Sequence, residues 1–308
     1  MLRPRFSDEE LVFVEDYGDV EPLVRQGTDS SCIVVAPAAQ REAALAHARA
    51  GRAEGRGPLP LQPARCGARC MIVLPTYNEI ENLEAVVEDA CDYLDTDLLI
   101  VDDGSPDGTG QLADRLAADN PRVQVMHRQG KLGLGTAYIE GFRRAIEGGY
   151  ERVFEMDADF SHPPWDLPRL AWAARDADLV IGSRYVQGGS TIGWDLKRRM
   201  LSRGANLYAR LLLATPISDM TAGFRCYDVA TLARLDLDKV NAEGYAFQVE
   251  MAFRLVRAGA RVRELPIHFT DRRVGASKMD ARIAREAIWL VPSLRRKVRR
   301  GGLLRDDR

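Results

Sequence analysis

The stretch MIVLPTYNEIENLEAVVEDACDYLDTDLLIVDD, residues 71–103, decides the fold class. Met71–Leu74 and Leu98–Val101 are short apolar runs of the kind that form buried strands. Between them, apolar side chains recur at the spacing of one helical face: Ile80, Leu83, Val86, Val87, Cys91 and Leu94. A strand, a helix and a second strand in this order predict two parallel strands joined by a right-handed crossover.

The same alternation continues along the chain. Further strands are predicted at Val123–Met126, Arg152–Met156 and Leu179–Ile181, and further helices at Thr109–Asp119 and Leu134–Ile146. The sequence therefore predicts an α/β fold with a mostly parallel central sheet flanked by helices.

The two ends of the chain differ from this middle part in composition. Residues 1–70 are acid-rich from Ser7 to Asp29 and dominated by Ala, Arg, Gly and Pro from Ala36 to Arg69. Their apolar residues show little periodicity, which predicts a low-complexity, mostly disordered extension. Residues 71–278 form the predicted folded domain. Residues 279–308 form a predicted C-terminal segment that is basic and amphipathic.

Charge and cysteine content exclude several protein classes. The 308 residues carry 43 Lys and Arg against 45 Asp and Glu, a net charge of −2, which argues against a nucleic-acid-binding protein. Five cysteines in this length exclude a disulfide framework, and we interpret all five as reduced cytosolic thiols. Apolar stretches are too short to span a bilayer, so we expect a cytoplasmic chain that is soluble or peripheral to a membrane.

Polar side chains follow four of the predicted strands. The clusters are Pro75–Glu79, Asp102–Ser105, Asp157–Asp159 and Gly182–Tyr185. In a parallel sheet, ligands bind beyond the carboxyl ends of the strands, so these clusters predict one shared site.

Asp157 and Asp159 are the predicted metal ligands. In an extended segment the two carboxylates turn to the same side, where they repel each other unless a cation lies between them. Mg²⁺ or Mn²⁺ with oxygen ligands fits this pair, and the alternative is a solvated acidic loop. Asp102 and Asp103 predict a turn that also contacts a ligand, either a second metal or a ribose or base.

Other site types have weaker support. Gly133 and Gly135 lack the spacing of a dinucleotide-binding loop, and neither a phosphate-binding P-loop nor a serine-hydrolase elbow occurs. Arg272, Arg273 and Lys278 form either a solvated basic loop or a clamp for phosphate groups. Asp195–Leu213 predicts an amphipathic helix with a basic rim, suited either to core packing or to an anionic membrane surface.

Nine stretches of the sequence match the motifs of one protein family. They are LPTYNEIENL (74–83), VDDGSPDGT (101–109), KLGLGTAYIEGF (131–142), MDADFSHPP (156–164), GSRY (182–185), GWDLKRRMLSRGANLYA (193–209), SDMTAGFRCY (218–227), GYAFQVEM (244–251) and FTDRRVGASK (269–278). From Met71 to about Lys278 the chain resembles the dolichol-phosphate mannosyltransferases, called polyprenol monophosphomannose synthases in bacteria. These are inverting nucleotide-sugar transferases of the GT-A fold.

The resemblance implies roles for residues at matching positions. The implied donor-binding residues are Pro75, Tyr77, Glu79, Val101, Asp103, Asp157, Ala158, Asp159, Arg184, Arg272 and Lys278, of which Asp159, Arg272 and Lys278 are the implied catalytic residues. Arg199, Ser202 and Arg203 are the implied contacts of the acceptor phosphate. Two positions depart from the family pattern: Ala276 stands where Glu is frequent, and Ser161 stands where some members have a metal-binding Gln.

The implied reaction transfers mannose from GDP-mannose to a polyprenyl phosphate, with Mg²⁺ or Mn²⁺ as cofactor. The implied location is the cytoplasmic face of a membrane, reached directly or through a membrane-embedded partner. Two alternatives stay open: another donor such as UDP-glucose on the same lipid, and an inactive nucleotide-sugar-binding subunit of a membrane complex.

Overall fold

The structure of the chain is a computed structural model. It describes residues 12–14, 33–35, 43–44, 63–240, 242, 244–271 and 291–296. Arg272 and Lys278, and most of the predicted terminal segments 1–70 and 279–308, lie outside the described residues.

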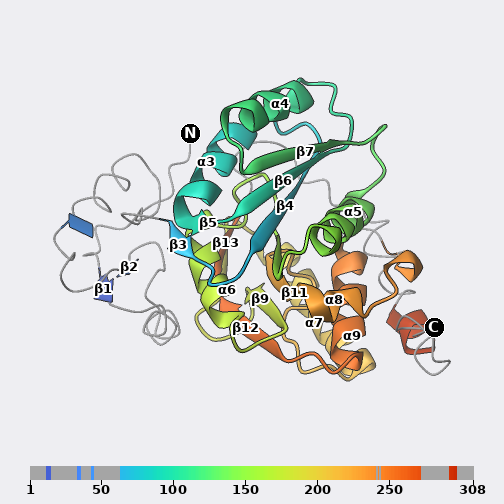
Figure 1. The fold of residues 1–308 in the computed structure, drawn as a ribbon. Helices are drawn as coiled ribbons and strands as arrows, with labels where there is room; N and C mark the ends of the chain where they lie inside the picture. Colours follow the sequence, from blue (N-terminus) through green and yellow to red (C-terminus); the bar gives the residue numbers. More distant parts are fainter. Residues whose placement is uncertain are drawn as a thin grey trace.

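The described elements alternate between strands and helices through most of the chain (Figure 1). The strands are β1 (Val12–Val14), β2 (Ile33–Val35), β3 (Ala64–Arg65), β4 (Cys70–Thr76), β5 (Leu94–Asp95), β6 (Asp97–Asp102), β7 (Val123–His127), β8 (Arg152–Glu155), β9 (Leu179–Ser183), β10 (Ser190–Ile192), β11 (Arg225–Asp228), β12 (Val262–Pro266) and β13 (His268–Thr270). The helices are α3 (Leu83–Tyr93), α4 (Thr109–Asp119), α5 (Leu134–Glu147), α6 (Leu167–Ala173), α7 (Leu196–Leu213), α8 (Val229–Ala233) and α9 (Tyr245–Arg257), with 3₁₀ turns η4 (Pro164–Asp166) and η5 (Leu237–Lys239).

The central sheet has seven strands in the order β12-β9-β11-β8-β4-β6-β7. β11 runs antiparallel to both of its neighbours, whereas the other pairs of the sheet are parallel. The predicted α/β fold with a mostly parallel sheet is confirmed. From β4 the chain adds β6 and β7 on one side and then returns to place β8 on the other, so the strand order reverses at β4.

Both faces of β4 are buried. Met71 and Val73 belong to one hydrophobic cluster with side chains of α5, α8 and α9, whereas Ile72 and Leu74 belong to a second cluster with α3, α4 and α6. Helices therefore cover the sheet on both sides (Figure 1). The near-continuous apolar run of this strand follows from burial on both faces.

The sequence located most elements of the sheet region. The predicted bounds of α4 are those observed, and α5 extends one residue beyond its prediction. The prediction that Ile80 lies on the buried face of α3 is wrong, because the helix begins at Leu83 and Ile80 is 41% exposed. The backbone N–H groups of Glu79 and Ile80 bond to the side chains of Thr109 and Asp107, so this segment is a loop tied to the start of α4.

The prediction that all five cysteines are reduced thiols is wrong for one pair. Cys66 and Cys70 form a disulfide, because the short segment before β4 turns back and brings the two side chains together. Cys91 and Cys226 are buried free thiols, and Cys32 lies outside the described residues.

None of the described helices combines the length and the apolar composition that crossing a membrane requires.

α5 packs closely on β4 because a glycine faces the strand. A Cβ atom at Gly141 would overlap the side chain of Val73, and one at Gly135 would lie 2.7 Å from the carbonyl oxygen of Ala242. These two glycines hold α5 against the middle of the sheet and against the start of α9.

We predict that Gly141→Ala lowers the free energy of unfolding by about 1–3 kcal/mol, the usual cost of overpacking a core. Thermal unfolding measures the change. Gly204→Ala is the control, because no atom lies within 4 Å of its Cβ position and alanine favours the helix by about 1 kcal/mol. Equal melting temperatures for Gly141→Ala and the wild type would contradict the close approach.

Candidate active site

The four predicted polar clusters lie at the carboxyl ends of β4, β6, β8 and β9. β4, β6 and β8 are neighbours in the sheet, and the strand order reverses at β4. In open α/β sheets this reversal opens a crevice beyond the strand ends. The sheet thus brings together three of the four clusters, those after β4, β6 and β8, and β11 lies between them and the cluster after β9.

Asp102 organises the loop that follows β6. Its buried carboxylate accepts hydrogen bonds from the hydroxyls of Thr76, at 3.1 Å, and Ser105, at 2.6 Å, and from the backbone N–H of Ser105. The predicted turn after β6 is confirmed, and Asp102 ties it to the end of β4.

Asp103 faces a buried arginine that the sequence analysis did not identify. Arg128 donates from Nη1 to Asp103 Oδ1 at 2.5 Å and from Nη2 to the Thr136 hydroxyl at 2.5 Å. The backbone N–H of Gly133 also donates to Asp103, at 3.3 Å. Because both members of the ion pair are almost fully buried, Asp103 joins the loop after β6 to the start of α5.

The loop after β4 carries the other implied nucleoside contacts. Pro75 is part of β4 and Val101 is part of β6, and the two are register partners. Tyr77 follows β4, and Lys131 Nζ lies 4.3 Å from the centre of its ring. The backbone N–H of Glu79 donates to Thr109 at 3.0 Å, which fixes this loop against the start of α4.

Asp157 lies two residues beyond the end of β8 and is held from two sides. Its backbone N–H donates to His162 Nδ1 at 3.0 Å, and its Oδ1 accepts a hydrogen bond from the Tyr138 hydroxyl at 3.3 Å. Burial lowers the pKa of His162, which favours the neutral ring, so that its Nδ1 can accept this hydrogen bond. Burial also raises the pKa of Tyr138 well above its usual value, which keeps the hydroxyl a donor.

Asp159 is more buried than Asp157 and is only 3% exposed. Its Oδ1 accepts a hydrogen bond from the backbone N–H of Ser161 at 3.0 Å. Phe160 adopts a φ of 60°, in the left-handed region that non-glycine residues rarely occupy. Ala158 is buried between the two aspartates.

These residues fit a divalent cation with oxygen ligands. Ser161 Oγ, two residues after Asp159, is buried and has no hydrogen-bond partner. Within the described parts of the chain, no group of three or more His, Cys, Asp or Glu side chains could hold a metal. Two carboxylates suit Mg²⁺ or Mn²⁺, which commonly complete their coordination with water and substrate phosphates.

Arg184 lies at the end of β9 as expected, but its side chain pairs with the protein. It forms a bidentate ion pair with the buried Asp219, at 2.8 and 2.7 Å, and donates to Thr221 at 2.7 Å. Burial opposes ionisation of both groups, yet their mutual attraction raises the pKa of Arg184 and lowers the pKa of Asp219. Contact between Arg184 and a donor phosphate stays a prediction.

The implied acceptor residues lie on α7. The Ser202 hydroxyl accepts a hydrogen bond from the Tyr185 hydroxyl at 2.7 Å. The guanidinium carbon of Arg203 lies 5.7 Å from the centre of the Tyr185 ring. Arg199 donates to the backbone oxygen of Trp194 at 3.3 Å. The helix is therefore attached to the loop that begins at Arg184.

Three residues that shape the site were not predicted from the sequence: Arg128, Tyr138 and Asp219. Tyr138 and Asp219 lie within two of the stretches that match the family, KLGLGTAYIEGF and SDMTAGFRCY. Their place in these stretches was the signal that could have identified them. Arg128 lies outside the matched stretches, and only the folded chain brings it to Asp103.

Comparison with known proteins identifies relatives across the region that contains the described site. The family described as Glycosyl transferase family 2 matches residues 71–235. Undecaprenyl-phosphate mannosyltransferase of Micrococcus luteus is 50% identical over 221 residues, covering 71% of this chain and 91% of the relative. Polyprenol monophosphomannose synthase of Mycolicibacterium smegmatis is 47% identical over 242 residues, covering 77% of this chain and 89% of the relative.

Solved structures have the same fold at low sequence identity. Glucosyl-3-phosphoglycerate synthase from Mycobacterium tuberculosis, solved with Mn²⁺ and UDP-glucose, matches with a TM-score of 0.55 and 19% identity. The match covers 77% of this chain and 87% of that one. It confirms the predicted GT-A-type fold.

The buried Glu155 side chain makes the stability of the fold depend on pH. Burial outweighs the nearby charge of Arg225 and raises the pKa of Glu155 from 4.5 to about 8. The folded chain therefore keeps this proton while the unfolded chain loses it between these two values, so the group costs stability as pH rises.

We predict that the free energy of unfolding of the wild type falls between pH 5 and pH 8 relative to Glu155→Gln. The difference is on the order of a few kcal/mol, because one pKa unit corresponds to about 1.4 kcal/mol. Denaturant unfolding at several pH values measures it. Parallel pH profiles for the two proteins would mean that Glu155 is ionised in the fold.

Proposed function

The chain belongs to glycosyl transferase family 2, and we propose that it transfers mannose from GDP-mannose to a polyprenyl phosphate, giving polyprenyl-phosphate-mannose and GDP. The observation that carries this proposal is the identity of 47–50% to two proteins named for this class of product. The part of the chain that matches the family, residues 71–235, contains the carboxyl ends of β4, β6, β8 and β9.

The acceptor in this reaction supplies its own nucleophile. A phosphate monoester has a second pKa near 6 and is mostly a dianion at neutral pH. Its oxygen attacks the anomeric carbon of mannose, the bond from that carbon to the GDP diphosphate breaks, and the electron pair leaves with GDP. In-line attack inverts the configuration, and the acceptor oxygen carries no proton that a general base must remove.

The protein then has two tasks, which are to align the reactants and to offset their charge. We propose that Asp157 and Asp159, with the backbone at Ala158, hold Mg²⁺ or Mn²⁺ beside the donor diphosphate. When bound, the cation acts as a Lewis acid that neutralises charge on the leaving group. Pro75, Tyr77, Glu79, Val101 and Asp103 line the proposed nucleoside site.

Positive side chains lower the repulsion between acceptor phosphate and donor diphosphate. The family resemblance assigns this role to Arg272 and Lys278, with Arg184 as a third cation. Asp271, the residue before Arg272, pairs with Arg198 of α7 at 2.9 Å. Phe269 packs against His162 at 5.7 Å between ring centres, so the chain leading to Arg272 is anchored beside the aspartates.

We further propose that α7 contacts the membrane that contains the lipid acceptor. Its buried residues are only Asn206, Ala209 and Leu213. Large apolar side chains of the helix stay 54–69% exposed: Leu196, Met200, Leu201, Leu207 and Leu211. Lys and Arg residues on the same helix suit anionic lipid headgroups, each being worth about 1 kcal/mol near such a surface. The proposed location is the cytoplasmic face of the membrane.

We predict that Asp159→Ala lowers mannosyl transfer at least about 100-fold. Metal-assisted charge stabilisation is worth several kcal/mol, and about 1.4 kcal/mol corresponds to tenfold in rate. The assay incubates protein, polyprenyl phosphate and Mg²⁺ or Mn²⁺ with labelled donor and measures label in the extracted lipid. Asp119→Ala, an exposed aspartate at the end of α4, is the control and should stay active. Near-normal transfer by Asp159→Ala would remove the metal assignment.

The same assay with labelled UDP-glucose tests the donor. Label in lipid from GDP-mannose alone supports the proposed reaction, whereas label from UDP-glucose alone keeps the fold and changes the donor. Label from neither donor, with anionic vesicles present, would favour an inactive subunit or a requirement for a membrane-embedded partner.

We predict that Leu196→Glu/Leu211→Glu lowers flotation with anionic liposomes about tenfold or more, because two apolar contacts are replaced by charges that anionic lipid repels. GDP binding should stay unchanged. Gln111→Glu/Ala118→Glu adds the same charge to exposed positions of α4 and is the matched control. Equal flotation of the α7 variant and this control would contradict membrane contact through α7.

A further inference from the structure

The Asp157 carboxylate lies at the edge of the protein interior. Its side chain is 33% exposed, and its Oδ2 lies 3.8 Å from His162 Nδ1. The Tyr138 hydroxyl donates to Asp157 Oδ1 at 3.3 Å. This contact joins residues from α5 and from the end of β8, which are 19 positions apart in the chain.

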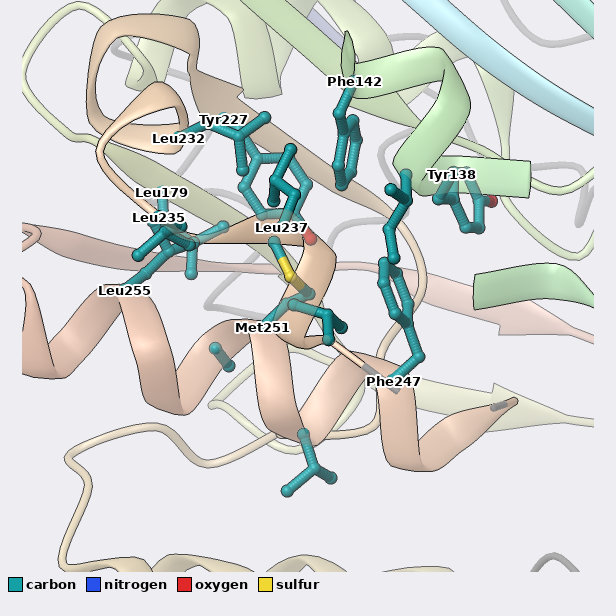
Figure 2. Close-up of a cluster of buried hydrophobic side chains, with 14 of the residues drawn as sticks. Tyr138, Phe142, Leu179, Tyr227, Leu232, Leu235, Leu237, Phe247, Met251 and Leu255 are labelled. Atoms are coloured by element: carbon teal, nitrogen blue, oxygen red, sulfur yellow. The ribbon is translucent and has the colours of Figure 1, made fainter. Parts of the chain in front are cut away.

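The ring of Tyr138 is held tightly by other aromatic side chains. Phe247 of α9 stacks on it with ring centres 6.0 Å apart and planes 8° apart, and Phe142 lies at 6.2 Å and 25°. Figure 2 shows Tyr138 at the edge of this aromatic cluster, with its hydroxyl oxygen on the side away from Phe142. Tyr138 is fully buried, so its ring cannot move without moving the core.

The backbone around Tyr138 is also fixed. Gly135, one turn earlier on α5, approaches the Phe247 ring so closely that a Cβ there would lie 3.1 Å from it. Gly141, nearly one turn later, lies against Val73 of β4. The hydroxyl position is thus set by packing between the sheet, α5 and α9.

We propose that Tyr138 is a positioning residue, whose hydroxyl fixes the orientation of the Asp157 carboxylate for a divalent cation bound with the nucleotide. This inference rests on the proposed metal role of Asp157. Carboxylates that bind metals are commonly oriented by a hydrogen bond from a neighbouring group, and loss of such a bond typically weakens metal binding 10–100-fold. The hydroxyl has no need to touch substrate or metal for this role.

A purely structural role for Tyr138 makes a different prediction. If the residue only fills the core, Tyr138→Phe keeps the ring contacts and leaves metal affinity unchanged. If it orients Asp157, the loss of one oxygen atom weakens metal binding while the fold persists. Metal affinity, measured apart from catalysis, separates the two roles.

The test titrates Mn²⁺ into full-length protein with saturating GDP and follows free Mn²⁺ by electron paramagnetic resonance. Tyr138→Phe should raise the Mn²⁺ dissociation constant about 10–100-fold. Tyr150→Phe is the matched control, because it removes the hydroxyl of another buried tyrosine, which bonds to Asp97 at the opposite end of β6 from the site. Its Mn²⁺ affinity should equal that of the wild type.

A double-mutant cycle shows whether Tyr138 acts through Asp157. In an Asp157→Asn background, Tyr138→Phe should cause little further loss of Mn²⁺ affinity, because the two changes share one interaction. Phe247→Leu loosens the packing on the Tyr138 ring while leaving the hydroxyl, and it should weaken Mn²⁺ binding relative to both the wild type and Tyr150→Phe. This variant also keeps the inference testable if Tyr138→Phe fails to fold.

The outcomes separate this inference from the proposed function. Equal Mn²⁺ affinity of wild type and Tyr138→Phe, with Mn²⁺ bound by the wild type, overturns the role of Tyr138 and leaves the metal assignment intact. Additive losses in the double-mutant cycle overturn it as well. Failure of the wild type to bind Mn²⁺ in the presence of GDP overturns the metal assignment, and the positioning role with it.

Discussion

Burial of both faces of β4 is the constraint on which the rest of the structure depends. Met71 and Val73 pack under α5, while Ile72 and Leu74 pack under α3 and its neighbours. The same strand lies in the interior of the sheet, with β6 on one side and β8 on the other. The reversal of strand order at β4 then places the loop of Asp102 and the loop of Asp157 on either side of its carboxyl end.

Buried ion pairs hold the loops that the sheet brings together. Arg128 ties Asp103 to α5, and Arg184 ties Asp219 to the end of β9. Such pairs pay a large desolvation penalty and add little net stability compared with apolar packing, although removal of one partner costs several kcal/mol. In this protein the two pairs join loops that follow different strands.

The chemistry of the proposed reaction explains what these loops must provide. The nucleophile is already an anion, so the barrier is dominated by alignment of two charged reactants and by charge on the leaving diphosphate. α7 carries exposed apolar residues, and the buried Asn206 on the same helix bonds to Thr221, which accepts from Arg184. The proposed lipid-facing helix and the loop beyond β9 are therefore one connected unit, and this geometry suits an acceptor whose phosphate stands at a membrane surface.

The sequence by itself determined what depends on local spacing. Alternating apolar runs and helical periodicity predicted β4, α4 and α5 with their approximate bounds, and the polar residues after each run located the loops of the site. Tertiary structure decided which distant residues meet. The antiparallel placement of β11, the pairing of Asp103 with Arg128, the contact of Tyr138 with Asp157 and the disulfide of Cys66 with Cys70 all depend on chain paths that no local pattern encodes. It also decided that α7 keeps its apolar side chains exposed, because periodicity predicts an amphipathic helix but burial depends on which surface of the fold lies beside it.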